Sequence, residues 1–152
     1  MTHKVIQSKH YIKNIDFEYV ETYSFQQESY YSETTRNTVM ASWYDNRITD
    51  LMGNLNRSSK KISSFQRSGR DMIKLNHILE TEIINLPSWM CLPIYRDAIV
   101  FYSKSGEIVS ALNVCFECSY MEDDKGININ ADESTYGLLK SFLISKGHKI
   151  RS

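Results

Sequence analysis

Two apolar runs separated by a short turn constrain the fold more than any other feature of the chain. "IYRDAIVFYS" (94–103) and "EIVSALNVCFECSYM" (107–121) are joined by "KSG" (104–106). A three-residue connection that ends in glycine is typical of a type I turn followed by a left-handed residue. The two runs therefore predict an antiparallel β-hairpin.

Two segments before the hairpin carry the pattern of regular structure. Residues 15–25 alternate and are rich in aromatic and β-branched side chains, which predicts a strand. Ser68 followed by Asp71 resembles a capping box, which predicts a helix that opens there and runs to about Ile84, with Pro87 beyond its end. The expected inward face of this helix consists of Met72, Leu75, Leu79 and Ile83.

A last helix is predicted after the hairpin. Asn130 or Asp132 serves as its cap and Gly147 as its stop. Its expected inward residues are Leu138, Leu139, Phe142 and Leu143. The order strand, helix, hairpin, helix predicts an α+β fold, in which a small antiparallel sheet that includes the hairpin packs against two or more helices.

The remaining segments are less regular. The length of 152 residues fits a single domain over 1–152, and the polar residues 1–13 are expected to form a loose N-terminal arm. Residues 38–55 fit a helix or a strand equally well. The run from Arg57 to Arg70 holds five basic residues and no acid, and we interpret it as a solvated connection, with binding of phosphate or an acidic partner as the alternative.

Charge and apolar content argue against several classes of function. Lys plus Arg and Asp plus Glu each number 18, so the balanced charge gives no reason to expect nucleic-acid binding. The longest apolar stretch, "DAIVFY", is too short to cross a bilayer, and the first residues lack the apolar core of a signal peptide. Three cysteines, an odd number, fit a reducing compartment. We therefore expect a cytoplasmic protein with no membrane or nucleic-acid partner.

Cys115 and Cys118 are spaced as in a metal or redox site. If the second strand of the hairpin continues through Cys118, however, side chains three apart face opposite ways, which does not suit chelation. Cys91 is available as a third zinc ligand, and His77 or His148 as a fourth, but the pattern is incomplete. We expect no metal and no cofactor, and we interpret the cysteines as small buried side chains.

The hairpin register links Cys118 to a different cysteine. If Tyr102 pairs with Glu107 across the turn, then Cys91 lies opposite Cys118. Directly opposed strand residues lie close to disulfide reach, so the two are predicted to be neighbours, although a cytoplasm would keep them reduced.

Tyr95, Arg96 and Asp97 lie where the hairpin begins. They are candidates for a functional polar cluster at the strand end. The plainer interpretation is a surface ion pair between Arg96 and Asp97, which contributes little stability.

The hairpin region resembles a group of small uncharacterised bacterial proteins, frequent in Bacteroidetes. Their shared core runs Cys-Tyr-x-Pro-Arg-His-x-Ile-x-Phe-Tyr, a short turn, then Ile-Cys-Phe-x-Cys. The residues that match it are Arg96, Ile99, Phe101, Tyr102, Cys115, Phe116 and Cys118. Tyr95 stands where the group has Pro, and Asp97 stands where it has His. Cys91 lies one residue further from Arg96 than the first Cys of the shared core lies from its Arg. The resemblance covers the C-terminal part of the chain, and because the group has no assigned activity it supports the hairpin and implies no function.

These observations favour a non-enzymatic protein-binding module, of an accessory or immunity type. No nucleophile, metal or phosphate-binding signature occurs, and the 10 tyrosines suit an interface. The alternative is a thiol-dependent enzyme or structural zinc protein that uses Cys91, Cys115 and Cys118. The oligomeric state stays open, and a subunit of a homo-oligomer is a third possibility.

Overall fold

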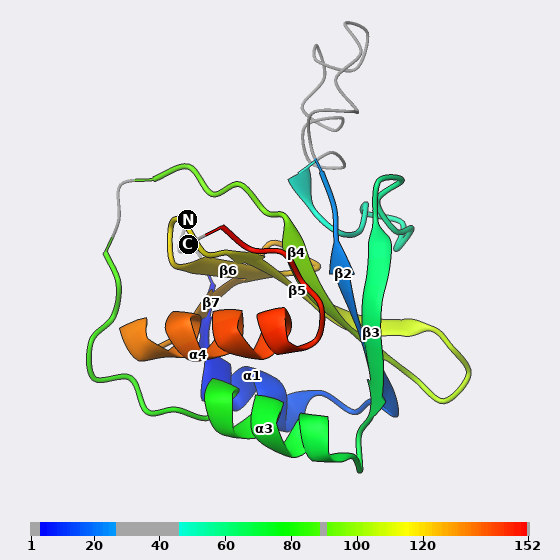
Figure 1. Ribbon diagram of the computed structural model, residues 1–152, viewed down its shortest axis with the longest axis horizontal. Helices are drawn as coiled ribbons and strands as arrows, with labels where there is room; N and C mark the ends of the chain where they lie inside the picture. The colour runs from blue at the N-terminus through cyan, green and yellow to red at the C-terminus, as the bar shows by residue number, and fades with distance from the viewer. Residues whose placement is uncertain (1–3, 27–45, 89–90, 152) are drawn as a thin grey trace, which may run out of the picture.

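The computed structural model describes residues 4–26, 46–88 and 91–151. In these residues a seven-stranded mixed sheet has the order β1-β7-β6-β5-β4-β2-β3 (Figure 1). The strands are β1 (Val5–Gln7), β2 (Tyr19–Ser24), β3 (Lys60–Gln66), β4 (Asp97–Tyr102), β5 (Ile108–Cys115), β6 (Tyr120–Asp123) and β7 (Asn128–Asn130). The helices are α1 (Ser8–Asn14), α3 (Arg70–Leu79) and α4 (Glu133–Ser145).

The α+β class is confirmed, and the sheet is larger than the small antiparallel one expected. All neighbouring strands are antiparallel except β1 and β7, which are parallel. Helices α1, α3 and α4 pack against one face of the sheet through a single apolar core. No helix among the described residues is long and apolar enough to cross a bilayer.

The central hairpin is confirmed as β4 and β5, but its register differs from the predicted one. Asp97 pairs with Val114 and Phe101 with Ser110, and a bulge then places Tyr102 opposite Ile108 instead of Glu107. The three-residue turn of residues 104–106 is as predicted, because the N–H of Ser103 donates to the carbonyl of Glu107 at 2.8 Å and closes it. Gly106 occupies the left-handed position, with φ +87°.

The prediction that the second strand continues through Cys118 is wrong. Strand β5 ends at Cys115, the chain turns over 116–119, and β6 pairs back so that Tyr120 lies opposite Cys115. The segment contains no Gly or Pro, and Ser119 supplies the left-handed conformation instead, with φ +50°. Nothing in the sequence of this segment therefore indicates that the chain reverses its direction here.

The first residues are not a loose arm over the part that the structure describes. Strand β1 pairs in parallel with β7, and α1 buries Tyr11 and Ile12 against the sheet. The hydroxyl groups of Tyr11 and Ser110 lie 2.8 Å apart. A short amphipathic segment is thus ordered by tertiary packing, which its polar composition conceals.

The basic run is also more ordered than expected, because half of it forms β3. Phe65 points into the core, where its ring lies 5.9 Å from that of Phe142, and this contact anchors the strand. Helix α3 then begins at Arg70 with Gly69 as its N-cap, so Ser68 is not the cap, and it ends at Leu79, well before Ile84.

The inward face of α3 is confirmed for Met72, Leu75 and Leu79. Residues 47–55, from the ambiguous segment, form neither a helix nor a named strand, and Thr49 and Leu55 meet in an isolated bridge. Residues 38–45 lie outside the described residues.

Helix α4 agrees closely with its prediction. The Asp132 carboxylate accepts a hydrogen bond from the N–H of Ser134, and Leu139, Phe142 and Leu143 are buried, whereas Leu138 is half exposed. At its end the N–H of His148 donates to Leu143 and that of Gly147 to Ile144. These two bonds form a Schellman motif, in which Gly147 has φ +113°.

We expect Gly147→Ala to lower the free energy of unfolding by about 1–2 kcal/mol, because its φ disfavours an L-residue. The new Cβ would also lie 3.1 Å from Ile62 Cγ2. Gly137→Ala is the matched control: the new Cβ in exposed mid-helix meets nothing within 4 Å, and it is expected to raise the stability by up to about 1 kcal/mol. Urea denaturation measures both, and equal stabilities would contradict this role of Gly147.

Candidate functional site: an anchored loop and its surroundings

The described residues between α3 and β4, 80–88 and 91–96, are called the loop of residues 80–96 here, and one carboxylate fixes this loop near its start. The N–H groups of Ile84 and Asn85 both donate to Asp132 Oδ1 at 2.8 Å, and the N–H of Glu133 donates to the carbonyl of Asn85 at 2.8 Å. The hydroxyl of Ser134, followed by the two loop N–H groups, holds the pKa of Asp132 well below its ordinary value. The same carboxylate therefore starts α4 and holds the loop.

A disulfide between Cys91 and Cys118 fixes the other end of the loop. The two Cα atoms are 5.8 Å apart and the residues are 27 positions apart in sequence. The prediction that these residues are neighbours is confirmed, but the expectation of reduced thiols is not met. The reason for the contact also differs, because β4 begins only at Asp97 and the turn at 116–119 brings Cys118 to the loop.

Cys115, the third cysteine, is a buried free thiol. Its Sγ accepts a hydrogen bond from the N–H of Ile94 at 3.4 Å, so it too contacts the loop. Among the described residues, no three His, Cys, Asp or Glu side chains converge as a metal ion requires. His148, considered above as a fourth zinc ligand, bonds instead to Asp97.

A cavity of about 220 Å³ lies against the inner side of the loop. Leu86, Pro87 and the Cys91–Cys118 disulfide line it from the loop, and Tyr136 lines it from α4. The described lining residues carry no charge. Burial raises the pKa of Tyr136, so its phenol is neutral and able to donate a hydrogen bond.

The outer side of the loop exposes large apolar side chains. Leu92 is 91% exposed and Ile84 81%, and Leu86 and Ile94 are also exposed. Leu92 stands between the disulfide and Pro93, and its carbonyl oxygen lies 3.5 Å from Cys118 Sγ. The loop thus presents Leu92 to solvent from a backbone that is fixed on both sides.

The structure does not gather Tyr95, Arg96 and Asp97 into one cluster. Arg96 is exposed and pairs with Glu117 at 3.3 Å, in contrast to the expected pair with Asp97. Tyr95 is buried on the face of the sheet opposite the helices, and Asp97 is buried on the helix face. Residues two apart in a strand share a face, but β4 begins only at Asp97, so Tyr95 lies in the preceding loop and does not follow the alternation of the strand.

Asp97 belongs to a buried chain of polar groups that the sequence did not reveal. His148 Nδ1 lies 2.8 Å from Asp97 Oδ1, and Nε2 lies 2.8 Å from Thr22 Oγ1. Thr22 in turn bonds to Ser63 at 2.5 Å. The connectivity is that of a hydrolase triad, but Thr22 has no exposed surface, so no substrate reaches its hydroxyl. We interpret these hydrogen-bonded side chains as a structural link that fixes His148, which follows α4, to strands β2, β3 and β4.

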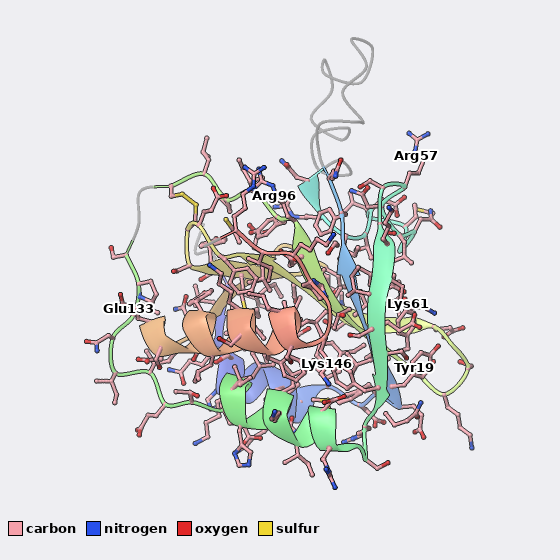
Figure 2. The ribbon with its side chains drawn as sticks, in the orientation of Figure 1. Tyr19, Arg57, Lys61, Arg96, Glu133 and Lys146 are labelled. Atoms are coloured by element: carbon pink, nitrogen blue, oxygen red, sulfur yellow. A yellow bond between two sulfur atoms is a disulfide. The ribbon has the colours of Figure 1, made fainter. Side chains whose placement is uncertain are left out.

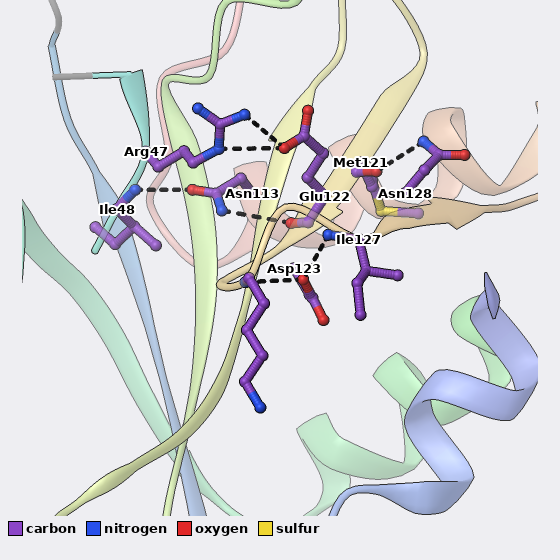
Figure 3. A network of polar contacts seen from close by, with 9 residues as sticks. Arg47, Ile48, Asn113, Met121, Glu122, Asp123, Ile127 and Asn128 are labelled. Atoms are coloured by element: carbon purple, nitrogen blue, oxygen red, sulfur yellow. Dashed lines mark hydrogen bonds and ion pairs between the residues drawn. The ribbon is translucent and has the colours of Figure 1, made fainter. Parts of the chain in front are cut away.

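A second polar network holds the chain against the opposite face of the sheet (Figure 3). The N–H of Ile48 donates to Asn113 Oδ1 at 2.8 Å, and Arg47 Nη2 pairs with Glu122 at 2.7 Å. The Arg47 guanidinium also lies 5.9 Å from the ring centre of Tyr95. These contacts pair the polar groups of Arg47, Asn113 and Glu122 with partners.

Comparisons with known proteins give no family for the chain: no family model, no curated protein and no solved structure matches it. The resemblance of the hairpin to the Bacteroidetes-type group therefore stays a prediction from the sequence.

Thiol titration tests the cysteine assignment. With a chromogenic thiol reagent, the native protein is expected to show no fast-reacting thiol, and denaturation without reductant is expected to release one, from Cys115. Reduction should raise the count to three. The double variant Cys91→Ala/Cys118→Ala is expected to lose about 3 kcal/mol of unfolding free energy through the lost loop constraint. Three thiols in the unreduced denatured protein would contradict the pairing.

Asp97 and Arg96 are neighbours in sequence, but their substitutions are expected to lower stability by very different amounts. Asp97→Ala leaves a buried imidazole without its partner and is expected to cost about 2–3 kcal/mol of unfolding free energy. Arg96→Ala removes only an exposed ion pair and is expected to cost at most about 0.5 kcal/mol. Chemical denaturation measures the unfolding free energy of both variants. Comparable losses would show that the buried hydrogen bonds of Asp97 and His148 are not a structural link.

Proposed function

We propose that the chain is a non-enzymatic protein-binding module, of accessory or immunity type, and that the loop of residues 80–96 is its recognition element. The observation that carries the proposal is the almost complete exposure of Leu92 beside a disulfide. A large apolar side chain in water is unfavourable, and a free surface loop can reduce the exposure by collapsing. This loop is tied down on both sides of its apolar residues, so Leu92 stays available to a partner.

Preorganisation of the loop favours binding for a second reason. A flexible loop loses conformational entropy when a partner orders it, and a loop that is already fixed avoids most of that loss. Asp132 and the Cys91–Cys118 disulfide provide this fixation from two different parts of the fold.

The chemistry of the loop indicates the kind of partner surface. The exposed side chains Ile84, Leu86, Leu92 and Ile94 are all apolar, and the only exposed ion pair close by in the described residues joins Arg96 to Glu117. A complementary surface therefore offers an apolar depression for Leu92 with a polar rim, which is the usual anatomy of a protein interface.

The thiol-based alternative has less support from the described residues. Two of its three sulfurs are joined to each other, and the third is buried under the loop. No specific observation favours a zinc or thiol-dependent activity over protein binding.

The proposal is tested by placing a photo-crosslinking residue at position 92 and, separately, at position 52. Met52 is 81% exposed in the turn of residues 50–54 and serves as the matched control. A partner that crosslinks at 92 and not at 52 is identified by mass spectrometry and purified. Calorimetry with that partner is expected to give a Kd at least about tenfold weaker for Leu92→Ser and unchanged for Met52→Ser.

Two outcomes would overturn the proposal. The first is crosslinking of native lysate proteins at 92 no stronger than at 52. The second is an unchanged Kd for Leu92→Ser with the purified partner.

A further inference from the structure

Strand β3 forms one edge of the sheet. It spans seven residues and pairs with β2 on one side, and it is the last strand in the sheet order (Figure 1). Among the described residues its outer side has no ladder partner, so a row of backbone N–H and C=O groups is available there. Such an edge is able to accept a further strand.

The outer edge is basic. Lys60, Lys61, Ser64 and Gln66 of the strand are exposed, and the segment from 57 to 70 contains no acidic residue. Figure 2 shows Arg57 near one end of β3 and Lys61 along the strand. Lys61 pairs with Glu21 at 3.1 Å yet keeps 56% of its side chain exposed, and Lys60 forms no ion pair with a described residue.

A second copy of the chain is a poor occupant for this edge. Pairing of two β3 strands would bring two sets of lysines together, and lysine on edge strands is a common means of preventing self-association. The same charges attract a strand that carries carboxylates, because opposite charges on neighbouring strands stabilise the pair.

We propose that β3 accepts an extended acidic segment of another protein, which adds to the sheet as a further strand. This surface is separate from the anchored loop, which contacts β6, β7 and the start of α4 on the other side of the central hairpin. Backbone hydrogen bonds supply the pairing, and Lys60 and Lys61 select acidic side chains. The proposal does not depend on the function of the loop.

The test uses the full chain and a set of synthetic peptides of eight residues. The first alternates Thr and Glu, the second is the same peptide with alternate amides N-methylated on one edge, and the third replaces Glu by Lys. Binding is followed by backbone NMR of the protein in low salt. The first peptide is expected to bind with a Kd on the order of 1 mM and to slow amide exchange in β3.

The methylated peptide separates strand addition from simple charge attraction. It keeps every carboxylate but cannot form the ladder on its blocked edge, so at least about tenfold weaker binding through that edge is expected. The other edge of this peptide is unblocked and can still pair with β3. Two further peptides are therefore made, one methylated on the opposite set of amides and one on both sets. The doubly methylated peptide is expected not to bind. Equal binding of the doubly methylated and unmethylated peptides would overturn the proposal, as would equal binding of the Lys peptide.

Charge reversal locates the surface. Lys60→Glu is expected to weaken binding of the Thr-Glu peptide at least about fivefold, while Lys74→Glu, an equally exposed lysine on α3, is expected to leave it unchanged. Ser64→Glu is a second variant at an exposed position of β3, and urea denaturation establishes that each variant is folded. Equal effects of the substitutions in β3 and α3 would show that no specific edge is recognised.

Discussion

The structure depends on the complete burial of strand β4. All six of its residues are buried, and they point alternately to the two faces of the sheet. A strand that is apolar on both sides requires cover on both sides, since an exposed face would place Ile99 and Phe101, or Ala98 and Val100, in water. Helices α1, α3 and α4 cover one face, and irregular chain around Ile48 and Tyr95 packs on the other.

This double burial also determines where polar groups are found inside the protein. Asp97 and Asn113 lie on the central strands and are enclosed with them. A buried polar group without a partner is costly, so each is satisfied by a group from a distant segment, His148 in one case and the N–H of Ile48 in the other. The resulting bonds fix the chain after α4 and the segment around residue 48 at defined points on the sheet. Segments without regular structure are thus positioned by hydrogen bonds to buried polar side chains of the sheet.

The sequence predicted the elements whose local signals agree with their tertiary environment. The hairpin and α4 with its Asp132 cap each combine the right periodicity with the right turn or cap residue. The inward face of α3 was predicted from its periodicity alone, since Ser68 is not its cap. The turn after Cys115 could not be predicted, because Ser119 adopts its conformation without Gly or Pro. Strands β1 and β3 were missed because each has few buried side chains and is ordered mainly by pairing with a neighbour that lies far along the chain.

In the candidate site, too, some features could be predicted from the sequence and others could not. The proximity of Cys91 and Cys118 could be inferred, though from a register that does not occur. The bond between His148 and Asp97 could not, since nothing local connects residues 51 positions apart. The exposure of Leu92 was equally hidden, because an apolar residue between Cys and Pro is as compatible with a core position as with a surface one.

The parallel pairing of β1 with β7 has a consequence for how the molecule assembles. Residues near the start of the chain hydrogen-bond with Asn128, Ile129 and Asn130, so the loop that must close is nearly as long as the domain. Closure of so long a loop has a high entropic cost, and the hydrogen bonds between the two strands offset this cost only when both strands are in place. During synthesis, Val5–Gln7 is made long before its partner and has no strand to join until β7 has been made. This segment is therefore among the last of the sheet to reach its native position.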